Sequence, residues 1–346
     1  MSTVGTTSGG VRFGFIGAGW IAHRALAPAV HAADGAVLQA AAARDADRAA
    51  SLEPAGRSYG GPDGYRALIA DPEVDVVYVN LSNEGHRPWS LAALEAGKHV
   101  LCEKPLGLDA AEVNQMIGAA ERAGRLLVEA FWYRWHPRTR RLEELLAAGD
   151  LGPVREMEAD FSFDGRTEQR MAANYRLDPE RGGGALYDVG CYSVSAAHTV
   201  LGTDLRVAGA QAVIGDTGVD LTTTARLRAG AGPHRDAVAL ALCGIAIPDR
   251  QVLRVTGGAA TAEFTGDGGQ TGEAFTSWHT PSSLLITTPD GAVREERFPP
   301  VDPYRVMVEA VAAGVRGEQA FLLGPQHSTE VVRTTDAIRA AAVPVL

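Results

Sequence analysis

The chain has 346 residues and a hydrophobic content of 46%, so we expect two domains, each large enough to bury a core. Its formal net charge of −10 argues against general binding to nucleic acid or to an anionic membrane. The three cysteines, Cys102, Cys191 and Cys243, are odd in number and widely spaced. This spacing indicates reduced thiols, with neither a disulfide framework nor a zinc site.

The first ten residues are rich in Gly, Ser and Thr. They lack the basic and apolar segments of a targeting peptide, so residues 1–10 are predicted to be a disordered leader. No apolar run of the sequence reaches the length that crosses a membrane. Together with the reduced cysteines, these observations predict a cytoplasmic protein.

A glycine-rich turn follows the first predicted strand, residues 11–16. The turn reads Gly17-Ala18-Gly19-Trp20-Ile21-Ala22 and leads into an Ala-rich amphipathic stretch. In this G-x-G-x-x-A pattern the first glycine permits a tight turn, the second lets a pyrophosphate approach the backbone, and the alanine lets the helix pack closely. We therefore predict a dinucleotide-binding turn, with a plain tight turn as the alternative; its cofactor-binding residues would be Gly17, Gly19, Trp20 and Ile21.

The end of the second predicted strand, residues 37–43, bears on the choice between NAD and NADP. An acidic residue there would accept the ribose 2′-hydroxyl of NAD, but the sequence reads Ala43-Arg44-Asp45. Arg44 could pair with the 2′-phosphate of NADP. NADP(H) is therefore favoured over NAD(H). Asp45 is the opposing observation if the strand ends one or two residues later.

Polar side chains follow two further predicted strands. Ser82, Asn83 and His86 come after the strand at 74–81, and Glu103 and Lys104 come after the strand at 99–102. In open α/β sheets, ligands bind just outside the carboxyl ends of the strands. We therefore expect these five side chains to contribute to cofactor binding. The alternatives are ordinary turn capping and a surface ion pair.

Strand and helix patterns alternate through the first part of the chain. This alternation predicts that residues 1–131 form a doubly wound parallel sheet of the Rossmann type. In residues 132–346 many strands follow each other too closely for helical crossovers, which predicts a largely antiparallel sheet. The expected strands of this second domain lie at 154–163, 206–215, 219–229, 236–246, 251–256, 260–265, 283–289 and 294–298.

One helix, expected over 185–201, interrupts that series of strands. Gly182-Gly183-Gly184 precedes it, and such glycines let a ligand approach the amino end of a helix. Asp188 and Tyr192 are four residues apart, so they are expected to share one helix face. The alternative is that Asp188 caps the helix and Tyr192 belongs to the core.

Together these motifs resemble the glucose–fructose oxidoreductase, inositol dehydrogenase and MocA (GFO/IDH/MocA) family of NAD(P)-dependent oxidoreductases. The likeness runs from Val11 to about Gly202. Its most specific parts are the glycine-rich turn, the segment "AGKHVLCEKPL" at 96–106 and the segment "GGGALYDVGCY" at 182–192. The resemblance implies a Rossmann domain followed by an α/β domain with a large open, mostly antiparallel sheet.

The resemblance also implies roles for single residues. Lys104 matches the active-site lysine of the family, whose bond to the next proline is often cis in relatives. Asp188 matches an acidic residue near the substrate. Tyr192 stands where inositol-type members have His and where glucose–fructose oxidoreductase, sugar ketoreductases and dihydrodiol dehydrogenases have Tyr. Two departures are Ser82, where relatives commonly have Pro, and Ala43, which removes the acidic marker of NAD preference.

The implied chemistry is hydride exchange between a nicotinamide and a carbon that bears OH or C=O. A tyrosine can donate the proton, and a nearby lysine ammonium lowers the pKa of a tyrosine and stabilises a developing oxyanion. We therefore assign Tyr192 as acid/base and Lys104 as its electrostatic partner, or the reverse. Asp188 would orient Lys104 or a substrate hydroxyl.

The substrate class is open between several alternatives. Four arginines before the glycine-rich segment could seat a diphosphate, which favours a ketoreductase of a nucleotide-linked keto-sugar; they are Arg166, Arg170, Arg176 and Arg181, and Arg134 is a further candidate. Otherwise these arginines form a solvated surface. The runner-up activity is dehydrogenation of a free pyranose or a trans-dihydrodiol. A catalytically silent NAD(P)-binding regulator is the rival from another class, and the intact set of Lys104, Asp188 and Tyr192 argues against it.

A homodimer or homotetramer through the second sheet is expected, with no nucleic acid, membrane or metal partner. The stretch from Ala237 to Ile247 is almost unbroken in apolar character, so both faces of its strand would be apolar in places. Such a strand exposes a large apolar patch unless something covers it. The alternative is that the chain's own helices, such as the one expected at 303–315, cover the second face.

Overall fold

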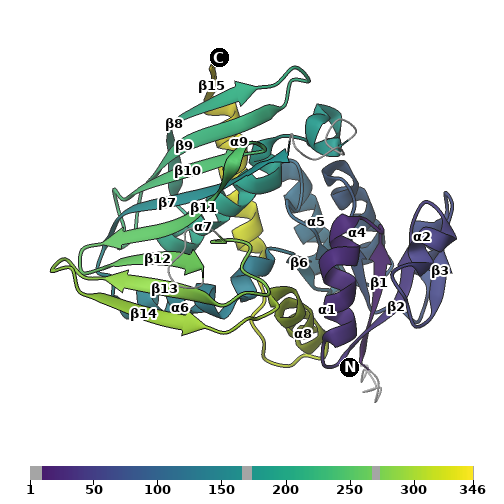
Figure 1. Ribbon diagram of the computed structural model, residues 1–346. Coiled ribbons are helices and arrows are strands. Elements are labelled where there is room, and N and C mark those ends of the chain that lie inside the picture. The colour runs from purple at the N-terminus through teal and green to yellow at the C-terminus, as the bar shows by residue number, and fades with distance from the viewer. Residues whose placement is uncertain (1–9, 166–173, 267–272, 346) are drawn as a thin grey trace. The chain divides into compact units, whose positions relative to one another are not determined.

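The chain divides into two compact units in the computed structural model, which describes residues 10–165, 174–266 and 273–345 (Figure 1). Unit 1 comprises Met1–Gly107, Ala111–Trp135 and Asp302–Pro325, and unit 2 comprises Leu108–Ala110, His136–Val301 and Gln326–Leu346. The predicted domain boundary, between residues 131 and 132, lies close to the change of unit at Trp135. The return of residues 302–325 to unit 1 differs from the predicted division, in which they belong to the second domain.

Unit 1 is built on a six-stranded parallel sheet of order β3-β2-β1-β4-β5-β6. Its strands are β1 (Val11–Ile16), β2 (Ala36–Ala42), β3 (Arg57–Tyr59), β4 (Val76–Val79), β5 (His99–Cys102) and β6 (Leu127–Glu129). Its helices and short helical turns are η1 (Ala22–Leu26), α1 (Ala27–Ala32), α2 (Ala46–Ala50), α3 (Gly64–Ala70), η2 (Asn83–Gly85), α4 (His86–Glu95), α5 (Ala110–Ala123), η3 (Trp132–Trp135) and α8 (Pro303–Val315). The strand order is that of the Rossmann fold, which confirms the predicted doubly wound sheet.

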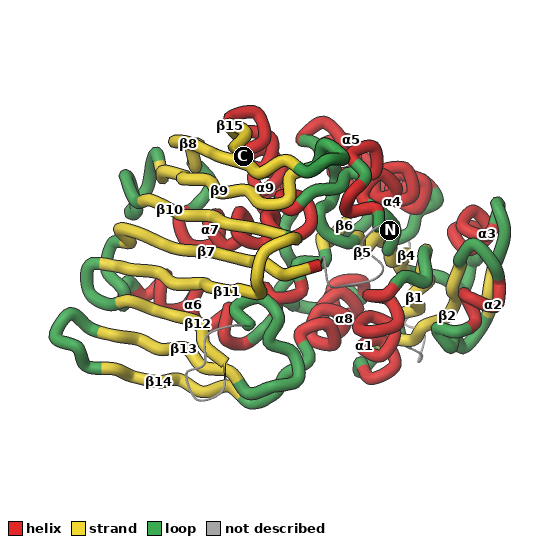
Figure 2. The backbone as a smooth tube through the Cα atoms, turned by 45° about the horizontal axis from the view of Figure 1, so that its top comes forward, coloured by secondary structure: helices red, strands yellow, loops and turns green. Residues whose placement is uncertain are grey.

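The apolar runs of the sequence account for the centre of this sheet. Phe13, Phe15 and Ile16 of β1 are fully buried, and so are all residues of β4. Figure 2 shows α1 and α8 on one side of these strands and α4 on the other. Parallel strands read as continuous apolar runs because helices cover both of their faces.

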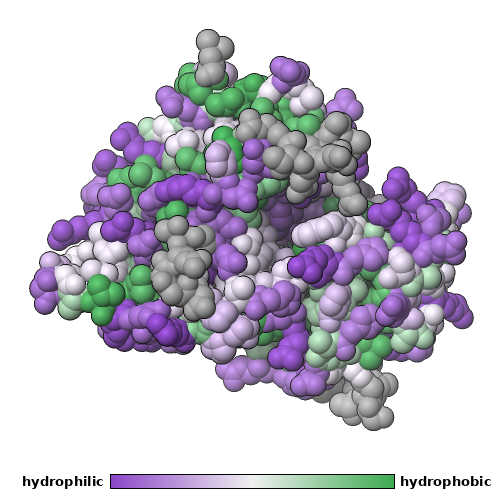
Figure 3. Space-filling view, viewed as in Figure 1, coloured by the Kyte–Doolittle hydropathy of each residue, from purple (hydrophilic) through white to green (hydrophobic). Residues whose placement is uncertain are grey.

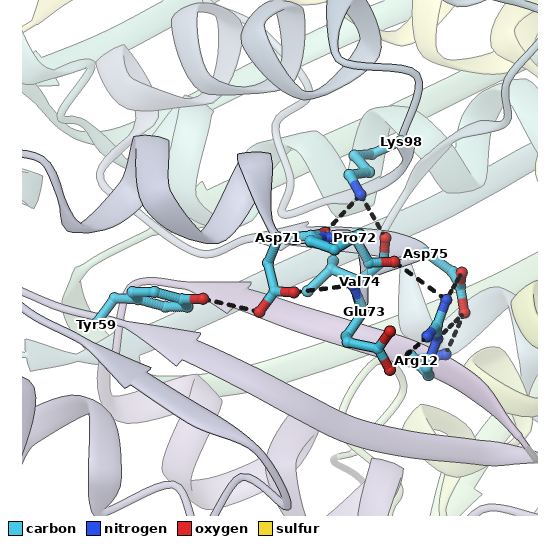
Figure 4. Close-up of polar contacts among 8 residues, drawn as sticks. All are labelled: Arg12, Tyr59, Asp71, Pro72, Glu73, Val74, Asp75 and Lys98. Atoms are coloured by element: carbon cyan, nitrogen blue, oxygen red, sulfur yellow. Dashed lines mark hydrogen bonds and ion pairs between the residues drawn. The ribbon is translucent and has the colours of Figure 1, made fainter.

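A polar network, the amino-end cluster, holds the amino ends of β1, β4 and β5 (Figure 4). It consists of Arg12, Tyr59, Asp71, Glu73, Asp75 and Lys98. Arg12 donates through Nε and Nη2 to Asp75 at 3.0 and 2.9 Å. Lys98 Nζ donates to the carbonyl oxygens of Asp71 and Val74, both at 2.7 Å. Burial raises the pKa of Asp75, but the hydrogen bonds and charge of Arg12 outweigh it and hold that pKa below its usual value.

Unit 2 is built on a nine-stranded sheet of order β14-β13-β12-β11-β7-β10-β9-β8-β15. Its neighbouring strands are antiparallel except for the parallel pairs β10–β7 and β15–β8. The strands are β7 (Val154–Asp164), β8 (Leu205–Ile214), β9 (Asp220–Ala229), β10 (Val238–Gly244), β11 (Ala246–Gly257), β12 (Thr261–Gly266), β13 (Ser282–Thr287), β14 (Val293–Phe298) and β15 (Ala342–Val345). The predicted mostly antiparallel sheet is confirmed.

Helices of unit 2 pack against one face of this sheet. They are α6 (Pro137–Ala148), α7 (Cys191–Leu201) and α9 (Pro325–Ala341), with the short turns η6 (Tyr175–Leu177), η7 (Pro179–Arg181) and η8 (Leu186–Gly190). Helix α7 lies on β7 and β10. The helix at 303–315, which we considered as a cover for the second face, is α8 and belongs to unit 1.

The outer face of this sheet is mixed in character. Ala239, Ala241 and Cys243 of β10 are buried, whereas Leu240 is 40% exposed. Across the sheet Leu240 lies beside Arg226 of β9 and Glu158 of β7, and Figure 3 shows hydrophilic and apolar residues interspersed over the strands of unit 2. The outer face is therefore apolar only in places, with charged residues on the neighbouring strands flanking Leu240.

Among the described helices, none combines the length and hydropathy that crossing a membrane requires. Two strands, β3 and β15, were not predicted from the sequence. Each lies at an edge of its sheet and is short, with three and four residues. A strand of that length carries too little periodicity to be detected.

Candidate active site

The glycine-rich turn lies where the sequence predicts it, between β1 and η1. Gly17 has φ of +97°, and a Cβ there would lie 2.0 Å from the carbonyl oxygen of Asn80. Only glycine fits this position. Gly17 N donates to Ala42 O at 2.9 Å, which ties the turn to the end of β2. Trp20 is 66% exposed at the start of the helix.

Asp45, the acidic residue that argues against an NADP preference, lies beyond the end of β2. The strand ends at Ala42, and Asp45 is the N-cap of α2, where its Oδ1 accepts a hydrogen bond from Arg48 N at 2.7 Å. Arg44 is exposed between them. Arg48, which the sequence analysis missed, donates through Nε to Ala18 O at 3.1 Å. The Asp45 carboxylate is thus engaged in capping, Arg48 contacts the turn, and Arg44 is exposed after the strand.

Glu103 and Lys104 follow β5 and begin a tightly held turn. The Tyr78 hydroxyl donates to Glu103 Oε1 at 2.7 Å, and burial, followed by the charge of Glu103, raises the pKa of Tyr78 well above its usual value. The bond between Lys104 and Pro105 is cis. The fully buried ring of His86 faces Pro105 O through Nδ1 at 2.8 Å. His86 therefore fixes the turn that carries Lys104.

His86, Ser82 and Asn83 were predicted to bind the cofactor. The Nε2 atom of His86 faces Leu81 O at 3.2 Å, and burial lowers the pKa of His86, with the charge of Lys104 lowering it further. Ser82 Oγ donates to Glu84 Oε1 at 2.6 Å, and Asn83, which is 2% exposed, begins η2. In the structure these side chains shape the turn after β4, and their contact with a cofactor stays a prediction.

Asn80, the residue directly after β4, is not among the predicted site residues. It was included in an apolar strand expected at 74–81, although an Asn in such a run is itself a signal. The structure ends β4 at Val79 and places Asn80 beside the glycine-rich turn. Asn80 is therefore a further polar residue at the carboxyl edge of the sheet.

In unit 2, Asp188 is 4% exposed and its Oδ2 accepts a hydrogen bond from Arg176 Nε at 2.5 Å. Asp188 was predicted to orient Lys104 or a substrate hydroxyl, and Arg176 was predicted to meet a substrate diphosphate. Gly184 N donates to Arg176 O at 2.8 Å, so the glycine-rich segment holds Arg176 in this position. The two residues neutralise each other's charge within unit 2.

Tyr192 lies at the start of α7 among aromatic side chains. It is 4% exposed, and its ring centroid lies 5.2 Å from that of Phe161 and 5.8 Å from that of Phe275. Tyr187, in the preceding turn, donates its hydroxyl to Leu108 O at 2.7 Å, and burial raises its pKa to about 12. Tyr187 is thus tied to the backbone, and the acid/base role of Tyr192 stays a prediction.

The remaining arginine candidates are spread over the chain. Arg134 is 6% exposed in unit 1, with its guanidinium 6.0 Å from the ring centroid of Phe321. The Arg181 guanidinium lies 5.9 Å from the ring of Tyr175 in unit 2. Arg166 and Arg170 lie outside the described residues. Contact of any of these four arginines with a substrate stays a prediction.

The sequence profile of the oxidoreductase family with an NAD-binding Rossmann fold matches residues 11–131, and that of the GFO/IDH/MocA C-terminal domain matches residues 139–263. The chain belongs to the GFO/IDH/MocA family. This confirms the resemblance on which Lys104, Asp188 and Tyr192 were assigned. The chain is therefore a sugar oxidoreductase with an NAD(P)-binding Rossmann domain.

Several relatives resemble this GFO/IDH/MocA chain over more than half of its length. The D-xylose 1-dehydrogenase (NADP(+)) 2 of Haloferax volcanii is 37% identical over 95% of this chain and 97% of its own. A dTDP-3,4-didehydro-2,6-dideoxy-alpha-D-glucose 3-reductase of Actinomadura kijaniata is 37% identical over 58% of this chain and 59% of its own. A crystal structure of a 3-ketoreductase from Actinomadura kijaniata with NADP and TDP-benzene superposes with a TM-score of 0.85, at 28% identity, over 97% of this chain and 99% of that one.

The turn of unit 1 fits the dinucleotide that this family binds. A Cβ at Gly19 would meet the Asn80 side chain, 3.3 Å from Nδ2, and this buried Nδ2 has no hydrogen-bond partner among the described residues. Both features are those of a site shaped for a ligand with oxygen acceptors. Gly17, Gly19, Asn80 and the two arginines after β2 are the residues that would hold it.

Proposed function

We propose that this protein is an NADP(H)-dependent oxidoreductase that interconverts a hydroxyl and a carbonyl group of a sugar that carries no nucleotide. The Arg176–Asp188 ion pair is the observation that favours a sugar without a nucleotide as the substrate. A diphosphate binds through arginines whose charge is available to it, and Asp188 already neutralises Arg176. The likeness to a D-xylose 1-dehydrogenase (NADP(+)) over nearly the whole chain supports the same class.

The preference for NADP(H) rests on the end of β2. Because Asp45 caps α2, its carboxylate is engaged away from a ribose 2′-hydroxyl. Arg44 and Arg48 are exposed and positively charged, so they suit a 2′-phosphate. When bound, the nicotinamide would supply or accept the hydride.

Lys104 and Tyr192 would handle the proton. In the reducing direction the Tyr192 hydroxyl would donate its proton to the carbonyl oxygen of the sugar, and in the oxidising direction its phenolate would take the hydroxyl proton. The Lys104 ammonium would stabilise the phenolate and the negative charge on the substrate oxygen. The Phe161 and Phe275 rings around Tyr192 exclude water, which strengthens these electrostatic interactions.

A specific observation favours the reduction of a nucleotide-linked keto-sugar as the second candidate. The 3-ketoreductase that superposes on this chain was crystallised with TDP-benzene. Other structures of that ketoreductase carry a lysine replaced by alanine or glutamate, or a tyrosine replaced by phenylalanine. Lysine and tyrosine are the residue types that we assign here to proton transfer.

The test is a panel of substrates followed by absorbance at 340 nm. Reduction of NADP+ with free aldoses, and no oxidation of NADPH with dTDP-linked keto-sugars, is the expected result. The opposite pattern would show that the substrate is a nucleotide-linked keto-sugar and not a free sugar. Turnover with neither class would contradict both.

We also propose a homodimer or homotetramer through the outer face of the unit 2 sheet. Leu240 is exposed at the middle of this face and is an apolar side chain that a second copy could cover. Light scattering of the wild type should then give a mass above the 36.3 kDa of one chain. A glutamate in place of Leu240 should reduce the mass to that of the monomer.

A further inference from the structure

Asn80 is held firmly at the carboxyl end of β4. Its backbone N–H donates to Ile16 O at 2.9 Å, so it lies between β4 and the end of β1. Its side chain is 8% exposed, and Nδ2 has no hydrogen-bond partner among the residues that the structure describes. Buried amide groups of this kind almost always have a partner, because leaving a donor unpaired is unfavourable. The unpaired Nδ2 donor is therefore evidence that a ligand binds at this position.

The Asn80 side chain lies against the second glycine of the dinucleotide-binding turn. A Cβ placed on Gly19 would lie 3.3 Å from Asn80 Nδ2 and 3.7 Å from Oδ1. The missing side chain of this second glycine is what lets the pyrophosphate of a dinucleotide approach the backbone. The unpaired donor thus lies on the side of Gly19 where a side chain would otherwise stand.

We propose that Asn80 Nδ2 donates a hydrogen bond to a pyrophosphate oxygen of the bound dinucleotide. This makes Asn80 a cofactor-binding residue, in addition to the glycines of the turn. A hydrogen bond to a charged phosphate oxygen is stronger than one between neutral groups. The inference rests on dinucleotide binding by unit 1 and is independent of the preference for NADP(H), because NAD and NADP share the pyrophosphate.

Measured affinities test this assignment directly. The dissociation constants of NADPH and NADH are measured by calorimetry for the wild type, Asn80→Ala and Arg44→Ala. Asn80→Ala should weaken both nucleotides by the same factor, about 10-fold or more. Arg44→Ala, the matched control, should weaken NADPH alone. Wild-type affinity of Asn80→Ala for both nucleotides would overturn the proposal, whichever nucleotide or sugar the enzyme prefers.

Melting temperatures separate ligand binding from a structural role. Without nucleotide, Asn80→Ala should melt at the wild-type temperature or above it, because the substitution removes an unpaired buried donor. With saturating NADPH its increase in melting temperature should be smaller than that of the wild type. A lower melting temperature without nucleotide, together with an unchanged increase on adding NADPH, would show a structural role and overturn the proposal.

A second substitution identifies the acceptor. Asn80→Asp puts a negative charge beside the proposed pyrophosphate, so it should weaken NADPH binding more than Asn80→Ala does. A ribose hydroxyl, in contrast, could donate to the new carboxylate and preserve affinity. Affinity of Asn80→Asp equal to that of the wild type would therefore overturn the assignment to the pyrophosphate.

Discussion

Two lysines flank the same strand of unit 1 and illustrate how the two ends of a parallel sheet differ. Lys98 precedes β5 and donates to two backbone carbonyl oxygens, those of Asp71 and Val74. Lys104 follows β5 and belongs to the cis turn with Pro105, beneath which His86 is buried. Both residues are lysines beside β5, and they differ in that Lys98 lies at its amino end and Lys104 at its carboxyl end.

The polar groups at the two ends have different partners. In the amino-end cluster the charged groups bind protein atoms, as Arg12 binds Asp75 and Glu73 (Figure 4). At the carboxyl end, Asn80 has a buried donor without a partner among the described residues. We infer that the amino-end cluster serves stability, whereas the carboxyl end is shaped for a ligand, as is general in open α/β sheets.

The largest expected effect comes from removing the proton-handling groups. Lys104→Ala and Tyr192→Phe should each lower turnover by about 10²- to 10⁴-fold, because general acid/base catalysis is typically worth that much. Nucleotide affinity should change little. Steady-state rates and a fluorescence titration of NADPH measure the two quantities, and Lys98→Ala is the control that should keep wild-type turnover per folded molecule. Near-full activity of Tyr192→Phe would show that the proton comes from another group.

The next effect concerns the cofactor at the end of β2. Arg44→Ala should weaken NADPH by about 10- to 100-fold, the value of a hydrogen bond to a charged group, and leave NADH unchanged. Fluorescence titration of both nucleotides measures this preference. If the wild type prefers NADH, the assignment of Arg44 is wrong and the carboxyl end selects its cofactor through other residues.

The sequence predicts much of this architecture because the signals are local. A glycine-rich turn after a strand, and apolar runs ending in Glu103 and Lys104, place the carboxyl edge of the sheet without any tertiary information. The largely antiparallel character of the unit 2 sheet follows equally from closely spaced strands. The return of residues 302–325 to unit 1 has no such signal, since it depends on packing between segments far apart in the chain.

The partners within the site could not be predicted in the same way. The sequence identifies Asp188 and Arg176 as candidates but not as partners, because the bond depends on how the glycine-rich segment folds back. The role of Asp45 as a cap depends on the strand ending at Ala42, and strand ends are the least certain part of a prediction from sequence. Asn80 was missed because its contact with Gly19 exists only in the folded sheet.

The amino end should respond to substitution through stability alone. Lys98→Met removes the hydrogen bonds to Asp71 O and Val74 O, and it should lower the free energy of unfolding by about 1 to 2 kcal/mol, since the site is partly exposed. Burial lowers the pKa of Lys98, and the charges of Asp75 and Asp71 oppose this shift. Urea unfolding measures the loss. Lower turnover per folded molecule in Lys98→Met would contradict the division between the two ends.

The smallest expected effect is a pH dependence at the amino end, next to Lys98. Burial, followed by the positive charge of Arg125, lowers the pKa of His99 to about 4, and its Nδ1 accepts a hydrogen bond from Leu126 N at 3.0 Å. The unfolded chain takes up this proton near pH 6.5. The contribution of His99 to the free energy of unfolding is therefore full above pH 7, falls as the pH drops below 6.5, and levels off below about pH 4.

The variant His99→Asn tests this pH dependence, because its side-chain oxygen keeps an acceptor but cannot titrate. Between pH 7 and pH 5 this variant should lose about 1 kcal/mol less stability than the wild type, a figure reduced for the partial exposure of the ring. Urea unfolding at both pH values measures the difference, and equal losses in the two proteins would show that His99 keeps its ordinary pKa in the folded state.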